Sequence, residues 1–173
     1  STTASISSPV PRGRMGGGLA LDLRKADQLH LVFEQVISEL QSLYPQREIA
    51  SSLHPAMSLV CDAGRLGQLL SNLVKNALVH GADAQPVQVT ASANDDVFEL
   101  VVGNAGADIP PDVLGQLFKP FWRAAPSNGT GGLGLGLFIV AEIAKSHGGA
   151  VSVVSQAGHT AFKFRMAIAP AVG

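Results

Sequence analysis

Two pairs of segments with alternating apolar and polar residues constrain the fold of this chain most. One pair covers residues 87–93 and 97–102 around the turn Asn94-Asp95-Asp96, and the other covers 150–155 and 160–168 around Ala157-Gly158-His159. Alternation with a period of two is typical of strands with one buried face. A short turn between two such segments predicts an antiparallel hairpin. Two hairpins among helical segments favour an α+β fold over a regular parallel βαβ array.

Apolar residues recur at helical spacing in three longer segments. We expect helices from residue 29 to the Tyr44-Pro45 pair, over 62–79 and over 133–147, a short helix at 112–117, and short strands at 19–23, 48–53 and 57–61. Asp27 and Asp62 are the expected N-caps of the first two helices, because aspartate accepts backbone hydrogen bonds there. Gly81 is expected to end the second helix.

Length and composition limit the class of protein. The 173 residues suffice for one domain, with residues 19–170 as its folded part. Residues 1–18, rich in Ser, Thr, Pro and Gly, predict a flexible lead-in. A net charge of −1 argues against nucleic acid as a partner. The single cysteine, Cys61, excludes an intramolecular disulfide and favours a cytoplasmic location, and no apolar run reaches the roughly 20 residues that span a bilayer.

Polar side chains share one face of the second predicted helix. Asn72, Asn76 and His80 stand at i, i+4 and i+8, with Lys75 beside them. An amide oxygen can bind Mg²⁺, which usually keeps phosphate and water as its other ligands, and a lysine is a point charge for phosphate. The face is therefore a candidate for an anion with its metal, although an ordinary solvated helix face fits the same residues.

Small residues follow the second strand of the first hairpin. Asn104 stands at the expected strand end, and Gly106, Asp108, Ile109 and Pro110 come after it. An asparagine amide can pair with adenine, and glycine lets a backbone approach a flat ligand. A plain turn is the alternative interpretation.

Five glycines occur in the eight residues 129–136, directly before the third predicted helix. Glycine-rich turns at helix N-termini present backbone N–H groups to phosphate. The spacing matches neither the Gly-x4-Gly-Lys phosphate loop nor the dinucleotide fingerprint. The polar stretch before it is typical of a mobile lid, and a simple linker is the alternative.

Together these segments resemble the catalytic ATP-binding domain of bacterial sensor histidine kinases, which shares the Bergerat fold of the GHKL superfamily. Residues 72–80 resemble the N box, 104–110 the G1 box, 117–121 the F box and 132–137 the G2 box. The resemblance covers about residues 16–170. It implies a two-layer α/β sandwich, in which a mixed, mainly antiparallel sheet of about five strands lies under three helices, with an ATP lid.

The resemblance implies roles at the phosphate end of a bound ATP. Asn76 would hold Mg²⁺ against the phosphates. Asn72, Lys75 and His80 would contact phosphate or order the waters of the metal. Arg123 would reach the phosphates when the lid closes, so Lys75 and Arg123 are the residues expected to act in catalysis.

The resemblance also implies roles at the adenine end and in the lid. Asn104 would read adenine in place of the usual aspartate, Ile109 would pack on the base, and Gly106 and Thr160 would stand beside it. Phe118 and Phe121 would support the lid. The segment that would wrap the triphosphate comprises Gly132, Leu133, Gly134, Leu135, Gly136 and Leu137.

Two departures from the usual family pattern bear on activity. Asn104 replaces aspartate and Asp108 occupies a glycine place of the G1 box, although a subset that includes many bacteriophytochrome-like kinases carries a comparable asparagine version. Asn72 stands where ATP-hydrolysing relatives carry a glutamate general base, and an amide cannot take a proton. We therefore expect phosphoryl transfer to another acceptor rather than efficient hydrolysis.

The resemblance implies that this acceptor is a histidine on the kinase's own dimerisation domain, with a response regulator downstream. None of the five histidines has the sequence pattern of a phosphoacceptor, so we expect an excised domain that is monomeric and preceded in the kinase by a helical hairpin. The alternative is a degenerate nucleotide-binding module that regulates or scaffolds without phosphotransfer.

Overall fold

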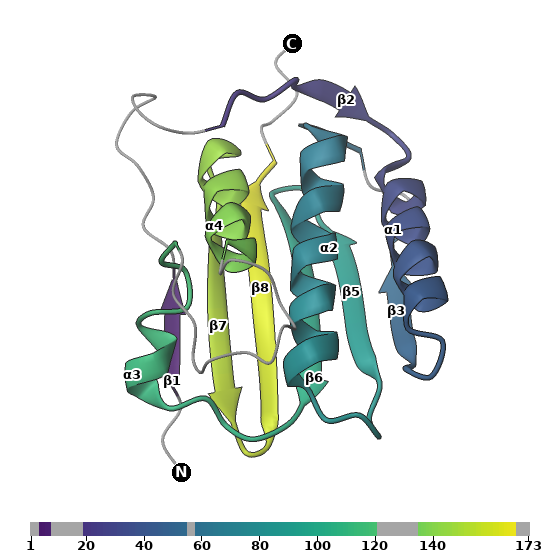
Figure 1. Ribbon diagram of the computed structural model, residues 1–173. Coiled ribbons are helices and arrows are strands. Elements are labelled where there is room, and N and C mark those ends of the chain that lie inside the picture. Colours follow the sequence, from purple (N-terminus) through teal and green to yellow (C-terminus); the bar gives the residue numbers. More distant parts are fainter. Residues whose placement is uncertain (1–3, 8–18, 55–57, 121–134, 169–173) are drawn as a thin grey trace.

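The computed structural model describes residues 4–7, 19–54, 58–120 and 135–168. A six-stranded sheet with the order β1-β7-β8-β6-β5-β3 carries helices on one face (Figure 1). Its strands are β1 (Ala4–Ser7), β3 (Ile49–Leu53), β5 (Val87–Ala93), β6 (Val97–Ala105), β7 (Ala150–Gln156) and β8 (His159–Ala167). The helices are α1 (Leu29–Leu43), α2 (Ala63–His80), α3 (Pro111–Leu114) and α4 (Gly136–Ser146), and β2 (Arg24–Ala26) pairs with β4 (Leu59–Cys61) in a separate ribbon.

The predicted α+β sandwich with a mixed sheet is confirmed. Strands β5, β6, β8 and β7 are antiparallel neighbours, and β3 joins β5 in parallel. Both predicted hairpins form, because each turn returns the chain with its apolar residues on the same face. In the second turn Ala157 and Gly158 both have positive φ, at 52° and 77°, as the tightest hairpin turns require.

The core lies between this sheet and α2. On the sheet, Phe98, Leu100 and Phe164 are fully buried, and on α2 the leucines at 66, 69, 70 and 73 face them. Each such side chain contributes about 1.5–3 kcal/mol by leaving water. Helices α1 and α4 pack on either side of α2, so α2 is the central helix of this layer.

The caps of α2 follow the prediction, whereas the cap of α1 does not. Asp62 Oδ1 accepts from the backbone N–H of Arg65 at 3.0 Å, and Gly81 is the C-cap. For α1 the N-cap is Gln28, without a side-chain bond. The prediction of Asp27 was wrong because its carboxylate accepts instead from Ser58 Oγ, at 2.8 Å.

The N-terminal part differs from the prediction in two places. The expected strand at 19–23 is displaced to Arg24–Ala26, where pairing with β4 is available. Within the predicted lead-in, Ala4–Ser7 forms β1 and pairs antiparallel with β7. An edge strand offers unpaired N–H and C=O groups to any extended segment that reaches it, so this pairing depends on the sheet and not on local composition.

Candidate functional site

Three polar side chains form a row across one end of the sheet. Within the described residues, Asn104, Ser155 and Thr160 are the buried polar or charged side chains, with exposures of 8%, 3% and 4%. Thr160 on β8 lies opposite Asn104 on β6 and opposite Ser155 on β7. All three continue the inward face that carries apolar residues elsewhere. Buried polar groups need partners, so this row is the polar corner of an otherwise apolar layer.

Hydrogen bonds connect the polar corner to the loop after β6. Ser155 Oγ accepts from the backbone N–H of Ile109 at 2.8 Å and lies 2.7 Å from Thr160 Oγ1. Asn104 Nδ2 donates to the carbonyl of Ala105 at 3.0 Å. The amide oxygen of Asn104 is thereby left as the acceptor that this side chain can offer to a ligand.

Two glycines lie beside the Asn104 side chain, and Gly81 leaves the room that it needs. A Cβ at Gly81, the C-cap of α2, would lie 2.8 Å from Asn104 Nδ2, and one at Gly106 would lie 3.6 Å from it. Gly106 also has a φ of +157°. The end of α2 is tied to the same place, because Ala82 N–H donates to the carbonyl of Ala105 at 2.8 Å. The sequence indicated Gly81 only as a helix stop, whereas its second role depends on this long-range contact.

Asp108 is directed to the β7–β8 turn. Its Oδ1 accepts from the backbone N–H of Gly158 at 2.8 Å, and Gly106 N–H donates to the carbonyl of Gly158 at 3.0 Å. The carboxylate at this unusual position thus anchors the loop on the turn, which accounts for one of the two departures from the family pattern.

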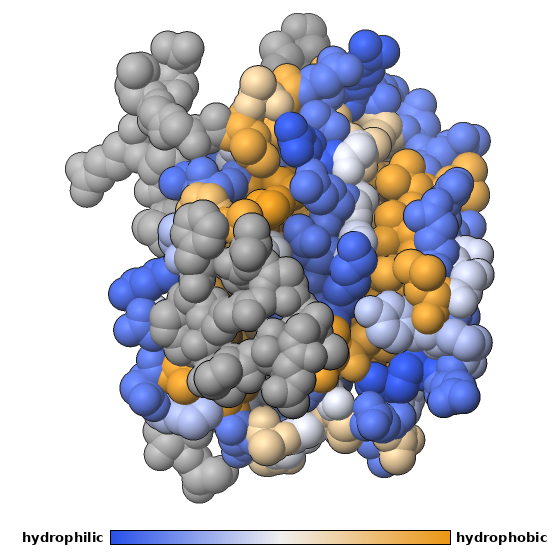
Figure 2. Space-filling model, in the orientation of Figure 1, coloured by the Kyte–Doolittle hydropathy of each residue, from blue (hydrophilic) through white to orange (hydrophobic). Residues whose placement is uncertain are grey.

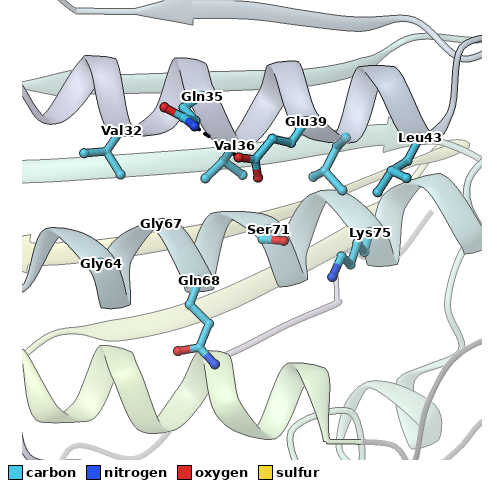
Figure 3. Close-up of a pocket in the computed structure, with 11 residues that line it drawn as sticks. Val32, Gln35, Val36, Glu39, Leu43, Gly64, Gly67, Gln68, Ser71 and Lys75 are labelled. Atoms are coloured by element: carbon cyan, nitrogen blue, oxygen red, sulfur yellow. Dashed lines mark hydrogen bonds between the residues drawn. The ribbon is translucent and has the colours of Figure 1, made fainter.

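The polar residues of α2 divide into two sets. Asn72 and Asn76 are half-buried, and Lys75 and His80 are exposed. Asn72 Nδ2 is buried and has no hydrogen-bond partner within the described residues. Lys75 lines a groove between α1 and α2 together with Val32, Glu39 and others (Figure 3). Asn72 and Asn76, one helical turn apart, therefore share one flank of α2, and Lys75 is exposed beside them.

The remaining predicted residues that the structure describes lie in the turn after α3 and at the start of α4. Phe118 packs edge-on against Phe162, with ring centroids 6.2 Å apart. Leu135 is the N-cap of α4, Gly136 is its first residue, and Leu137 packs on the core. Helix α4 covers only part of the length of β7 and β8, and its N-terminus is directed toward the end of the sheet that carries the polar corner (Figure 1). The predicted residues Phe121, Arg123, Gly132, Leu133 and Gly134 lie outside the described residues.

The N-terminus of α4 is electrostatically suited to an anion. The first turn of α4 carries no acidic side chain, and a helix N-terminus bears a partial positive charge that favours anions. In the parts of the chain that the structure describes, no three His, Cys, Asp or Glu side chains gather. No described helix has both the length and the apolar character needed to cross a membrane.

Comparisons with known proteins agree with this geometry. Residues 61–170 match the family model "Histidine kinase-, DNA gyrase B-, and HSP90-like ATPase". A bacteriophytochrome of Pseudomonas aeruginosa is 31% identical over 151 residues, which cover 86% of this chain and 21% of the relative. The sensor histidine kinase TrcS of Mycobacterium tuberculosis is 34% identical over 159 residues, covering 88% and 31%. The chain thus spans less than a third of either relative.

Solved structures show the same fold. Full-length ShkA in complex with AMPPNP is 32% identical, with a TM-score of 0.72 over 90% of this chain and 33% of that chain. The catalytic domain of histidine kinase ThkA is 22% identical, with a TM-score of 0.73 over 86% of this chain and 97% of that domain. The second comparison matches almost a whole catalytic domain and confirms the predicted architecture.

Proposed function

Because the chain belongs to the family of histidine kinase-, DNA gyrase B- and HSP90-like ATPases, we propose that it is the ATP-binding catalytic domain of a sensor histidine kinase in two-component signalling. It would bind ATP with Mg²⁺ and supply the γ-phosphoryl group to a histidine on a separate dimerisation domain. The observation that carries the proposal is the polar corner of Asn104, Ser155 and Thr160, to which the C-terminal end of α2, the helix that carries Asn72 and Asn76, is joined.

The two ends of the site suit the two ends of a nucleotide. Asn104 and Thr160, which are paired across β6 and β8, would read the base by hydrogen bonds, with Ile109 on the adjoining loop. The unpaired Asn72 Nδ2 is a donor suited to a phosphate oxygen. The N-terminus of α4 favours the negative charge of a triphosphate. Exposed His80 lies at the end of the same helix flank.

The donor set fits a magnesium ion that is carried largely by the nucleotide. Asn76 offers a neutral amide oxygen, and Mg²⁺ commonly takes few protein ligands alongside phosphates and waters. The bound ion would neutralise charge that develops on the phosphates. Asn76 would position it, while Asn72 one helical turn earlier would hold a phosphate oxygen.

Transfer is favoured over hydrolysis by the chemistry of Asn72. Its amide cannot accept a proton, so that position supplies no general base to activate water. Phosphoryl transfer requires mainly positioning and charge stabilisation, which the described residues offer. The partners that we propose are the kinase's own phosphoacceptor domain and a response regulator. A complex of ThkA with the response regulator TrrA has the same fold in its kinase. A cytoplasmic location and a monomeric isolated domain belong to the same proposal.

Binding and transfer can be tested in sequence. Calorimetric titration with a non-hydrolysable ATP analogue, with and without Mg²⁺, should show magnesium-dependent binding to the wild type and its loss in Asn76→Ala, with circular dichroism to show that both are folded. Radiolabelled ATP and a supplied phosphoacceptor domain should then give a labelled histidine. Absence of binding would refute the proposal, and binding without transfer to any supplied cognate domain would favour the regulatory module.

A further inference from the structure

The hydroxyl groups of Ser155 and Thr160 carry two protons, but the hydrogen bond between them uses only one. Ser155 Oγ and Thr160 Oγ1 share one hydrogen bond of 2.7 Å, but each hydroxyl carries a proton. Ser155 Oγ also accepts from the backbone N–H of Ile109. Both side chains are more than nine-tenths buried, so the second proton has a buried position without an acceptor among the described residues.

The Ile109 N–H determines which hydroxyl keeps that proton. Hydrogen bonds strengthen one another when they run in one direction, because a group that accepts becomes a better donor. Since Ser155 already accepts from Ile109, it is the better donor to Thr160 Oγ1. The chain of bonds then runs from Ile109 N–H through Ser155 O–H to Thr160, and its free end is the Thr160 hydroxyl proton.

This free donor lies beside a free acceptor. Thr160 is directly opposite Asn104 in the β6–β8 register, and side chains in such positions are about 5 Å apart at Cβ. Asn104 Nδ2 is held by the Ala105 carbonyl, which leaves Oδ1 to accept. The corner thus presents an acceptor and a donor side by side.

That pair complements one purine and opposes the other. The edge of adenine presents a donor, its amine, next to an acceptor, the ring nitrogen N1, whereas guanine presents a carbonyl acceptor next to a ring N–H donor. We propose that Ser155 is a positioning residue that makes the site select adenine over guanine, by fixing the Thr160 hydroxyl as a donor. This inference rests on the proposed nucleotide-binding function.

The variant Ser155→Ala tests the inference through a ratio. Without Ser155, the Thr160 hydroxyl can rotate and accept from the ring N–H of guanine. We expect the ratio of the dissociation constants of GTP and ATP analogues to fall by about tenfold. A merely structural role of Ser155 would weaken both nucleotides equally and leave the ratio unchanged. Ser155→Thr keeps the hydroxyl and should restore the ratio of the wild type.

Two further variants complete the experiment. Ser152→Ala is the matched control, because Ser152 lies on the same strand but alternates onto the opposite face, and it should retain the wild-type ratio. Thr160→Val removes the proposed donor while keeping the side-chain shape. It should lower the ratio of the GTP and ATP dissociation constants as Ser155→Ala does. It also provides the test if Ser155→Ala does not fold.

The possible outcomes separate this inference from the proposed function. A folded wild type that binds neither analogue refutes the proposed function and this inference with it. A wild type that binds the ATP analogue, with a ratio unchanged by Ser155→Ala or, if that variant is unfolded, by Thr160→Val, overturns the inference alone. A narrowed ratio in the variants, restored by Ser155→Thr, supports it.

Discussion

The two ends of α2 differ in how completely their polar groups are paired. At the N-terminal end, Asp62 accepts from the backbone N–H groups of Arg65 and Asp22, at 3.0 and 2.9 Å, and its own N–H donates to His147 Nε2 at 3.0 Å. Nδ1 of His147 donates to the carbonyl of Ile143 at 2.9 Å. These groups hold α2, α4 and the segment before β2 together, which is a structural task.

In contrast, polar groups on the C-terminal half of α2 and in the polar corner keep donors and acceptors that are not used in hydrogen bonds. Asn72 Nδ2 is buried without a partner in the described part of the chain, and the polar corner keeps an acceptor on Asn104 and a proton on Thr160. A buried polar group that is left unpaired costs about 1–3 kcal/mol. The paired end therefore stabilises the fold, while the other end gives up stability for ligand binding.

Removing the cap at the paired end should have the largest effect on stability. Asp62→Ala leaves two backbone N–H groups without their acceptor, and we expect a loss of about 2 kcal/mol in the free energy of unfolding. Urea denaturation measures it. Asp95→Ala, at an exposed aspartate of the β5–β6 turn, should change stability by less than about 0.5 kcal/mol. Equal losses in the two variants would show that the cap does not stabilise the domain.

Asp62 also makes the stability of the domain depend on pH. The backbone N–H of Asp22, followed by the N–H of Arg65 and the nearby charges of His147 and Arg65, lowers the pKa of Asp62 from 3.8 against the opposing effect of burial. Its contribution is thus fully present above the unfolded pKa and is lost as the pH falls through the folded value.

Replacing the unpaired group at the other end should separate stability from binding. In Asn72→Leu an unsatisfied amide is replaced by an apolar side chain of similar size. We expect the free energy of unfolding to stay constant or to rise by up to about 1 kcal/mol, while the affinity for an ATP analogue falls by about tenfold. Parallel urea denaturation and calorimetry would check both, with Ser71→Ala on the neighbouring position as the control. A loss of stability without a loss of affinity would contradict the comparison.

Local signals explain which parts of the fold the sequence predicted. Asp62 and Gly81 mark the ends of α2 by their own chemistry, and the alternation of Val87–Ala93 depends only on neighbouring residues. The failures depend on distant partners: Ala4–Ser7 becomes a strand because β7 offers an edge, and Asp27 leaves its helix for Ser58.

Ser155 is the functional residue that the sequence interpretation missed. Its importance depends on Ile109, which is 46 positions away, and on Thr160 across a turn. One local signal was available. Ser155 shares the inward face of β7 with Val151 and Val153. A serine at an inward position of a strand indicates a polar partner in the core.

A smaller effect on stability is expected from protonating His147, at the N-terminal end of α2. Burial, opposed by the Ile143 carbonyl and the Asp62 carboxylate, lowers the pKa of His147 below 6.5. The native state therefore prefers the neutral ring, whose Nε2 accepts from Asp62 N–H. Stability is then full above the unfolded pKa and is lost as the pH falls through the folded value.

The variant His147→Gln sharpens this expectation, because its amide oxygen can accept the same bond and does not titrate. Urea midpoints measured from pH 7.5 to about pH 5 should fall with decreasing pH in the wild type and change less in the variant. His54→Gln, at an exposed histidine, should behave as the wild type does. An equally steep fall in His147→Gln would assign the effect to other groups.

The smallest effect is expected at Lys75, because its side chain is exposed to solvent. The resemblance implies a phosphate contact for Lys75, and the side chain is exposed and borders the groove between α1 and α2. Figure 2 shows hydrophobic surface along α1 on this face of the domain. An exposed and solvated charge contributes little, so Lys75→Gln should weaken binding of an ATP analogue by less than about threefold. Asn76→Ala in the same titration is the reference for a true loss. If Lys75→Gln lowers the affinity for the ATP analogue tenfold or more, Lys75 contacts the phosphates and the site extends to the outer side of α2.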